Sequence, residues 1–218
     1  MRPLLGFDMD GVIIDSEDFS EVNWICEAFT KTLRDFGIPE NEENIRALYI
    51  KNMRCNAAVF CRRFGIDDPR LMWERREEHY ITEKLAALNA GAITLYPDVR
   101  ILKDLTCKYP MALVSNSPQV VVDRVVTRFS LAGLFRVQIG RGSSLQSLSR
   151  AKPAPDMLNE MKAVLKATAG YYVGDEPGDV QAALAAGLLP IRLVRDGGPG
   201  DIHSLIELGD YLQRIVLS

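Results

Sequence analysis

Five short, mainly apolar runs, each followed at once by a polar residue or glycine, constrain the fold of this chain more than any other feature of its sequence. They cover residues 4–7, 111–114, 135–139, 171–173 and 190–194. Such runs are typical of buried strands, and the segments between the later runs carry apolar residues at helical spacing. Strands that alternate with helices need crossover connections, which produce a parallel sheet with helices on both faces. The sequence therefore predicts an α/β protein with a doubly wound parallel sheet.

The segment between the first two runs is far longer than an ordinary crossover and has helical spacing throughout. Trp24 and Trp73 both lie in it, and we expect them to pack in a small core of its own. The expected helices cover residues 16–36, 43–50, 55–64 and 68–88, the last with Pro69 in its first turn. The predicted domains are an α/β core of residues 1–16 and 91–218 and a helical insertion of residues 17–90.

Charge and composition exclude several classes of protein. The chain has 26 Lys and Arg against 29 Asp and Glu, a net charge of −3, and 47% hydrophobic residues. This balance is typical of a globular protein and lacks the basic field that attracts nucleic acid, so we expect no nucleic-acid partner. No apolar run is long enough to span a membrane, and Asp8 interrupts the first run too early for an export signal. With four scattered cysteines and no Cys-x-x-Cys pair, the sequence favours a cytoplasmic protein without a membrane partner.

Polar side chains that can carry chemistry follow the predicted strands directly. In a parallel sheet, ligands bind at the carboxyl ends of the strands, so we expect these side chains at one edge. They are Asp8, Asp10 and Gly11 after the first strand, Ser115 and Asn116 after the second, Lys152 beyond the third, and Asp175 and Asp179 after the fourth. Each alone has an ordinary explanation as a turn, a helix cap or a solvated side chain. Together they supply a nucleophile, a proton donor, a hydroxyl and a cation, which indicates a catalytic site.

Three of these residues, Asp8, Asp10 and Asp175, also predict a metal site. Converging carboxylates raise one another's pKa values and destabilise the fold unless a cation lies between them. Mg2+ prefers oxygen ligands, retains water and commonly joins carboxylates to a substrate phosphate. We therefore expect Mg2+ as the cofactor.

Four segments carry a resemblance to a known family. They are FDMDGVIIDSE at residues 7–17, VSNS at 114–117, AKPAPDML at 151–158 and VGDEPGDVQAALAAG at 173–187. In order and spacing they resemble the motifs of the haloacid dehalogenase superfamily, in its branch of phosphatases with a helical cap after the first strand. The resemblance spans nearly the whole chain and implies a Rossmann-like core with the cap at residues 17–90.

The resemblance implies a role for each candidate side chain. Asp8 would attack the phosphorus to give an aspartyl-phosphate, and Asp10 would protonate the leaving alkoxide and then activate water, while its backbone carbonyl binds the metal. Ser115 would hydrogen-bond a phosphoryl oxygen, and Lys152 would neutralise charge on Asp8 and on the transferring group. The other expected site residues are Asp175 as a Mg2+ ligand, Asp179 as an outer ligand or orienting residue, and Gly11 and Asn116 as substrate-binding residues.

Two features of the sequence leave alternatives open. Glu176 stands where the family has a small hydroxyl residue, and we interpret it as the solvent-facing start of a helix rather than as a metal ligand. Lys51 and Arg54 lie where related caps carry a substrate loop, so they are candidates for binding a second anionic group of the substrate. The glycine expected in that loop is absent, and surface solvation explains both side chains equally well.

The remaining charged and polar segments receive structural interpretations. The charged runs at residues 62–63 and 74–78 have the spacing of a solvated helix face. His79 and His203 have no partner pattern and are assigned neither to catalysis nor to metal binding. Residues 140–149, rich in serine and glycine, are expected to form a mobile loop.

The leading hypothesis is a magnesium-dependent phosphatase that hydrolyses the phosphomonoester of a small metabolite, such as a phosphoglycolate-like acid, a sugar phosphate or a nucleotide. A phosphomutase of the beta-phosphoglucomutase type uses the same chemistry and is the main alternative. A binding or regulatory protein without turnover is a third hypothesis, against which the intact set of acids argues. Asp10 argues against dehalogenation, because the dehalogenases of this family lack that aspartate. The sequence determines neither the substrate nor the oligomeric state.

Overall fold

The computed structural model describes residues 2–16 and 24–216, and its centre is a five-stranded parallel sheet. The strands lie in the order β5-β4-β1-β6-β7, with β1 in the middle. Their bounds are β1 Leu4–Phe7, β4 Met111–Pro118, β5 Val137–Arg141, β6 Gly170–Gly174 and β7 Leu189–Arg192. Each predicted apolar run contributes one strand, and the strand order confirms the doubly wound α/β sheet.

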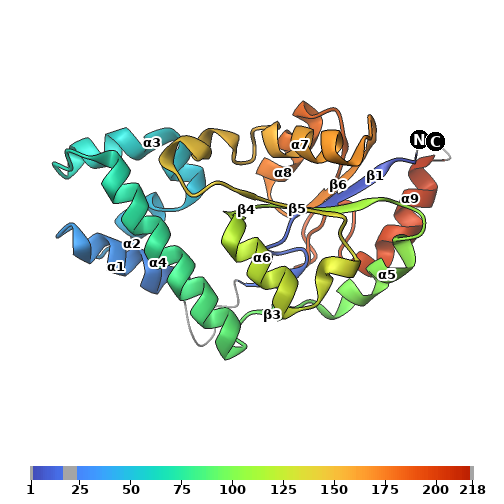
Figure 1. The fold of residues 1–218 in the computed structure, drawn as a ribbon, viewed down its shortest axis with the longest axis horizontal. Coiled ribbons are helices and arrows are strands. Elements are labelled where there is room, and N and C mark those ends of the chain that lie inside the picture. The colour runs from blue at the N-terminus through green and yellow to red at the C-terminus, as the bar shows by residue number, and fades with distance from the viewer. Residues whose placement is uncertain (1, 17–23, 217–218) are drawn as a thin grey trace.

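Helices cover both faces of this sheet (Figure 1). Successive side chains of a strand point to opposite faces, so neighbouring residues of β1 enter different cores. Leu4 belongs to the apolar cluster that contains the buried residues of α7 (Asp156–Leu165) and α8 (Pro177–Ala185). Leu5 belongs to the cluster that contains buried residues of α6 and α9. The helices of this second face are α5 Leu102–Leu105, α6 Gln119–Arg128 and α9 Leu208–Val216.

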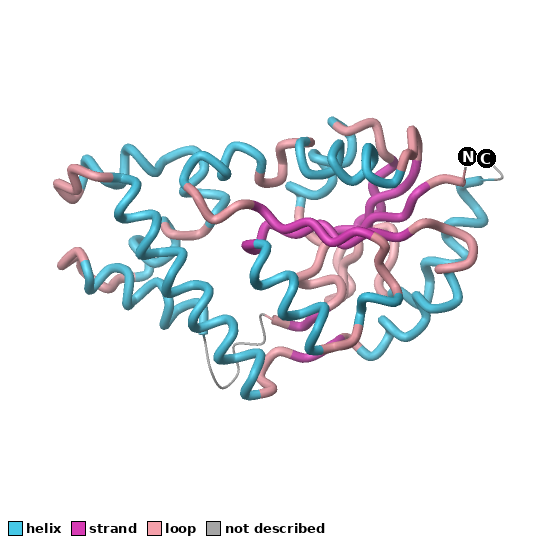
Figure 2. The backbone as a smooth tube through the Cα atoms, in the orientation of Figure 1, coloured by secondary structure: helices cyan, strands magenta, loops and turns pink. Residues whose placement is uncertain are grey.

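Four helices that lie between β1 and β4 in the sequence form a layer beyond one end of the sheet, at the left of Figure 2. We call them the helical layer: α1 Trp24–Asp35, α2 Glu42–Ala47, α3 Ile50–Arg63 and α4 Pro69–Ala90. The predicted start of the last helix is confirmed, because Asp68 Oδ1 accepts a hydrogen bond from Arg70 N at 2.9 Å and caps α4. The helix ends at Gly91, which has a φ of 81°.

Two predictions about this region extend beyond what the structure describes. The first helix was expected to begin near Ser16, and residues 17–23 lie outside the described residues. The division into a core and a cap at residues 17–90 stays a prediction. Within residues 2–16 and 24–216, no helix has both the length and the apolar character needed to cross a membrane.

A two-stranded antiparallel sheet, which the sequence analysis did not predict, joins the two connections between the helical layer and the parallel sheet. It pairs β2 (Ile14–Asp15) with β3 (Thr94–Leu95). Beside it, Arg195 lies 3.6 Å from the ring centroid of Tyr96 and donates hydrogen bonds to the backbone carbonyls of Gly11 and Val12, at 3.1 and 2.8 Å. The loop just after β1 is therefore held by Arg195, a residue far from it in the sequence.

One face of α4 contacts the end of the parallel sheet. Its Trp73, Glu77, Tyr80 and Lys84 recur at helical spacing and are all buried. Trp73 Nε1 donates to the carbonyl oxygen of Ser143 at 2.8 Å, and the Tyr80 hydroxyl lies 3.2 Å from Ser117 Oγ. Polar contacts of α4 thus attach the helical layer to the end of the sheet, in addition to the apolar cluster that the layer shares with β1.

The prediction that residues 74–78 form a solvated face is wrong for two of them. Arg76 is 1% exposed and Glu77 is 3% exposed, whereas Glu74, Arg75 and Glu78 on the opposite face are exposed. Burial is possible because Glu77 Oε1 lies 2.6 Å from Arg76 Nη1 and 2.7 Å from Arg141 Nη2.

Arg141 also corrects the prediction of a loop over residues 140–149. β5 continues through Arg141, whose side chain is fully buried against Glu77, and a 3-10 helix covers Leu145–Arg150. Arg141 and the carbonyl oxygen of Ser143 contact α4, whereas Ser144, Gln146 and Ser149 are exposed.

Replacing Glu77 tests this buried contact. Glu77→Gln removes the one negative charge shared by Arg76 and Arg141 and leaves two guanidinium groups buried together. We expect the free energy of unfolding to fall by about 3 kcal/mol, measured by urea denaturation. Glu78→Gln, at the exposed neighbouring position, is the control and is expected to change stability by less than about 0.5 kcal/mol. Equal, small effects of both substitutions would contradict the proposed energetic role of the cluster.

Candidate active site

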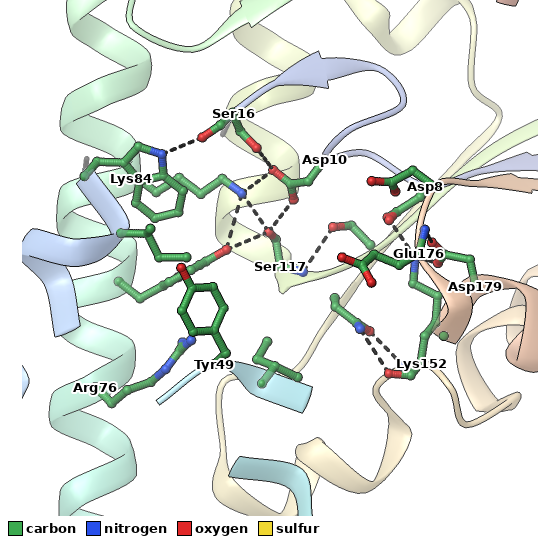
Figure 3. A pocket seen from close by; sticks show the side chains of 18 residues that line it. Asp8, Asp10, Ser16, Tyr49, Arg76, Lys84, Ser117, Lys152, Glu176 and Asp179 are labelled. Atoms are coloured by element: carbon green, nitrogen blue, oxygen red, sulfur yellow. Dashed lines mark hydrogen bonds and ion pairs between the residues drawn. The ribbon is translucent and has the colours of Figure 1, made fainter. Parts of the chain in front are cut away.

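A cavity of about 170 Å³ lies between the helical layer and the ends of β1, β4 and β6. Asp8, Ser115 and Lys152 line it from the α/β side, and Tyr49, Arg76 and Lys84 line it from the helical layer. Figure 3 shows Asp8 and Lys152 on one side of the cavity, and Tyr49, Arg76 and Lys84 on the other. The predicted edge of the sheet is therefore the place where the candidate side chains meet.

Lys152 is the central cation of the site. Its Nζ lies 2.7 Å from Asp8 Oδ1 and 2.6 Å from Asp179 Oδ1. The same nitrogen donates to the Tyr172 hydroxyl at 2.8 Å, and that hydroxyl donates to the carbonyl oxygen of Val114 at 2.7 Å. Burial alone would lower the pKa of Lys152, but the charges of Asp179 and Asp8 raise it well above its ordinary value. Lys152 therefore stays charged although it is buried.

Asp8, Asp175 and Asp179 form an acidic cluster in which one ligand oxygen of each lies within 4.8 Å of the others. Burial raises the pKa of Asp8 well above its usual range, despite the charge of Lys152. Burial and the nearby charge of Asp179 raise the pKa of Asp175 to about 7. Asp175 Oδ1 is also buried without a hydrogen-bond partner among the described residues. Three carboxylates share the single positive charge of Lys152, and Asp175 Oδ1 is free to accept a ligand. This arrangement fits a hard divalent cation.

Gly11 shapes this cluster through its backbone. Its φ is 75°, and a Cβ at this position would lie 2.2 Å from Asp175 Oδ2. Only glycine allows the loop after β1 to approach the acidic cluster so closely. Gly11 is not among the described residues that line the cavity.

The carboxylate of Asp10 makes contacts different from those of Asp8. Its oxygens accept hydrogen bonds from Ser16 Oγ at 2.6 Å and from Ser117 Oγ at 3.0 Å, and Lys84 Nζ of α4 lies 2.5 Å from Oδ1 (Figure 3). Burial raises the pKa of Asp10, but the charge of Lys84 and the three hydrogen bonds outweigh it and lower the pKa below its usual value. Asp10 is thus an ionised carboxylate that links the α/β sheet to the helical layer.

Ser115 and Asn116 hold the backbone of the site. Ser115 Oγ accepts a hydrogen bond from the backbone N–H of Ser117 at 3.0 Å. Asn116 clamps Lys152, because its Oδ1 accepts from Lys152 N at 2.8 Å and its Nδ2 donates to Lys152 O at 3.1 Å. Both residues line the cavity, as predicted, and Asn116 also positions the lysine.

Two other expectations for site residues have different outcomes in the structure. Glu176 is exposed at the N-cap of α8, in keeping with its interpretation as a helix start. The backbone N–H of Glu176 donates a hydrogen bond to Asp179 Oδ2 at 3.1 Å.

Arg54 and the exposed Lys51 are not among the described residues that line the cavity. The structure therefore does not bring the predicted second-anion residues to the site.

Sequence reasoning missed the residues that the helical layer contributes. Lys84 and Arg76 come from α4, and Ser117 and Tyr172 support the predicted residues from β4 and β6. Ser117 lies within the second motif, so its position alone was a signal. For Lys84 the only signal was its helical spacing from Trp73, Glu77 and Tyr80.

A parallel sheet with a lysine, hydroxyls and a carboxylate cluster at its carboxyl edge is typical of a catalytic site. The comparison with family models agrees: residues 6–192 match the model of the haloacid dehalogenase-like hydrolases. The chain belongs to this family, which confirms the resemblance found in the four motifs.

Individual relatives have related names. The chain is 28% identical over 202 residues to the phosphoglycolate phosphatase of Rhodobacter capsulatus, covering 90% of this chain and 86% of that protein. The structure is similar to that of a predicted phosphoglycolate phosphatase from Haemophilus somnus, with a TM-score of 0.69, 22% identity and coverage of 97% and 98%. It is also similar to a Thermotoga maritima protein provisionally named beta-phosphoglucomutase, with a TM-score of 0.64, 21% identity and coverage of 98% and 99%. At these identities the two structural similarities establish the fold alone.

The raised pKa of Asp8 predicts that this residue destabilises the metal-free protein. When the pKa of a carboxyl is higher in the folded than in the unfolded chain, the folded state becomes less stable as the pH rises from the unfolded pKa to the folded pKa. In chelator at pH 8 we expect Asp8→Asn to increase the free energy of unfolding by about 1 kcal/mol, with a smaller gain at pH 4. Urea denaturation at both pH values measures this, with the exposed Asp67→Asn as control. A loss of stability at pH 8 would contradict the interpretation.

Proposed function

We propose that the protein is a Mg2+-dependent phosphatase that hydrolyses a small phosphomonoester through an aspartyl-phosphate on Asp8. The observation that carries the proposal is the position of Lys152, whose Nζ lies 2.7 Å from Asp8 Oδ1 beside a cluster of two further carboxylates. A phosphoryl group in transfer spreads negative charge over its oxygens, and cations on several sides stabilise that charge. The proposed reaction uses each buried charged group at the end of β1.

The proposed reaction has two steps. In the first, an Asp8 oxygen forms a bond to phosphorus as the bond to the ester oxygen breaks, and Asp10, which carries a proton in the substrate complex, gives that proton to the leaving alkoxide and becomes ionised. In the second, Asp10 takes a proton from water as the water oxygen attacks the phosphorus, and the carboxylate of Asp8 leaves. Lys152 and Ser115 hydrogen-bond the phosphoryl oxygens in both steps. Mg2+, held by Asp8, Asp175 and the Asp10 carbonyl, would neutralise charge on those oxygens when bound.

The contacts of Asp10 fit its part in the second step. With Lys84 at 2.5 Å and a lowered pKa, its carboxylate is ionised and able to accept a proton. Because Lys84 belongs to α4, this state depends on the position of the helical layer. The helical layer therefore acts as the cap that the sequence predicts at residues 17–90 and helps to exclude water from the cavity.

The substrate that we favour is phosphoglycolate or a phosphorylated acid of similar size. Relatives such as the Rhodobacter capsulatus protein are named phosphoglycolate phosphatases. The cavity of about 170 Å³ is smaller than ordinary sites for drug-sized ligands, which span roughly 300–1,000 Å³. This volume favours a short substrate over a nucleotide, and it also disfavours a sugar bisphosphate that must reorient during a mutase reaction. The cytoplasmic location expected from the sequence remains a prediction.

Phosphate release from a panel of phosphorylated metabolites tests this function. With Mg2+ we expect turnover of phosphoglycolate of about 1 per second or faster. Chelator should abolish the activity, and Asp8→Asn should reduce it by about 1000-fold or more. Asp67→Asn serves as the matched control.

Three other results would contradict the proposal in different ways. Interconversion of sugar phosphates with little phosphate release would indicate the mutase. Activity that persists in Asp8→Asn would exclude the aspartyl-phosphate. No turnover and no labelling of Asp8 on any substrate would favour the binding or regulatory protein.

Replacing Lys84 tests the role of Asp10. Because Lys84 lowers the pKa of Asp10, Lys84→Met should raise that pKa and move the acidic limb of the kcat–pH profile to higher pH. The exposed Lys103→Met is the control and should leave the profile in place. An acidic limb that does not move in Lys84→Met would show that Asp10 is not the group that titrates there.

A further inference from the structure

Two buried arginines share a single carboxylate at the junction of the helical layer and the α/β sheet. Arg76 of α4 and Arg141 of β5 are 1% and 0% exposed. Both are paired with Glu77 Oε1, at 2.6 and 2.7 Å. Because a guanidinium keeps its proton in proteins, the cluster carries two positive charges against one negative charge.

The hydrogen bonds within the cluster leave part of it unused. Arg141 Nε and Glu77 Oε2 are buried without a hydrogen-bond partner in the described part of the chain. Arg76 donates from Nε to the carbonyl oxygen of Leu48 at 3.1 Å and from Nη1 to Glu77. Among the described residues, Arg76 Nη2 makes no hydrogen bond. A fully buried donor without an acceptor, such as Arg141 Nε, is costly.

Arg76 is also held rigidly. Its guanidinium carbon lies 4.5 Å from the ring centroid of Tyr80, 4.7 Å from that of Phe29 and 5.2 Å from that of Trp73. These aromatic faces hold the plane of the guanidinium. Burial and the nearby charge of Arg141 lower the pKa of Arg76, so a negative charge beside it would be stabilising.

The catalytic cavity is the open side of this cluster. Arg76 lines the cavity together with Asp8 and Lys152, and Figure 3 shows it on the helical-layer side, next to Tyr49. The other cations that line the cavity are already paired, Lys152 with Asp8 and Asp179, and Lys84 with Asp10. Among the lining residues of the described chain, Arg76 is therefore the cation with a donor to spare.

We propose that Arg76 binds a second anionic group of the substrate, a carboxylate, while the phosphoryl group lies against Asp8 and Lys152. This proposal rests on the proposed phosphatase function and narrows its substrate class to short phosphorylated carboxylic acids. Arg76 lines the same cavity of about 170 Å³ as Asp8 and Lys152, so both sites face one small volume. The planar guanidinium matches the geometry of a carboxylate. Arg76 takes over the function that the sequence analysis gave to Lys51 and Arg54.

A pair of substrates that differ only in the carboxylate tests the proposal. Ethyl phosphate has the carbon skeleton of phosphoglycolate without its negative second group. The measured quantity is kcat/KM for phosphoglycolate divided by kcat/KM for ethyl phosphate. We expect this ratio to be about 100-fold lower in Arg76→Gln than in the wild-type protein. Arg76→Lys, which keeps the charge but not the planar fork, should recover part of that ratio. The exposed neighbour Arg75→Gln should keep the wild-type ratio.

A binding measurement without turnover separates this proposal from the proposed function. Phosphonoacetate and ethylphosphonate form the corresponding pair of ligands with an uncleaved carbon–phosphorus bond. Calorimetry in Mg2+ should give wild-type protein a preference for phosphonoacetate that Arg76→Gln reduces by about 100-fold.

The two experiments have distinguishable outcomes. If wild-type protein releases no phosphate but binds phosphonoacetate through Arg76, the proposed function is wrong and the carboxylate site stands. If wild-type protein is active and Arg76→Gln loses activity equally on both substrates, Arg76 is structural and this proposal is wrong. An unchanged preference in Arg76→Gln, in either experiment, overturns it as well.

Discussion

The ammonium group of Lys152 allows three carboxylates to lie together at the end of a buried strand. It contacts Asp8 and Asp179 directly, and it is itself held by the Tyr172 hydroxyl and by the backbone clamp of Asn116. Like charges in a low-dielectric environment repel strongly, so the cluster needs a cation that cannot move away. β1, β4 and β6 must be in register for this arrangement, because each supplies one of the groups involved. The stability of the sheet and the chemistry of its edge therefore depend on the same contacts.

The charges around the cavity are arranged in three groups with different balances. The group around Lys152 contains three aspartates and is negative overall. The pair of Lys84 with Asp10 is neutral, and the group of Arg76, Arg141 and Glu77 is positive overall. An elongated substrate with two anions and an accompanying divalent cation would complement this distribution at both ends. Two of the three groups also join α4 to the α/β sheet, so the position of the helical layer and the charge of the site are coupled.

The strands and the core of the site could be predicted because both depend on local sequence. Short apolar runs give strands, and the residues that follow them, such as Asp8, Ser115 and Asp175, must lie at the carboxyl edge of a parallel sheet. The burial of a charged residue has no such local signal. Arg76 and Glu77 resemble the exposed residues beside them in type, and they are buried only because Arg141 is brought to them from a distant strand.

The hydrogen bonds from Arg195 to the carbonyls of Gly11 and Val12 form late in synthesis of the chain, long after Gly11 and Val12 are made. Asp8 and the loop that follows it are made well before their anchor, because Arg195 is separated from Gly11 by 184 positions. β1 is also the central strand, and its neighbours β4 and β6 emerge long after it. A ribosome-bound chain therefore carries Asp8 without the groups that position it until Arg195 has been made. The loop after β1 reaches its final position only after that point.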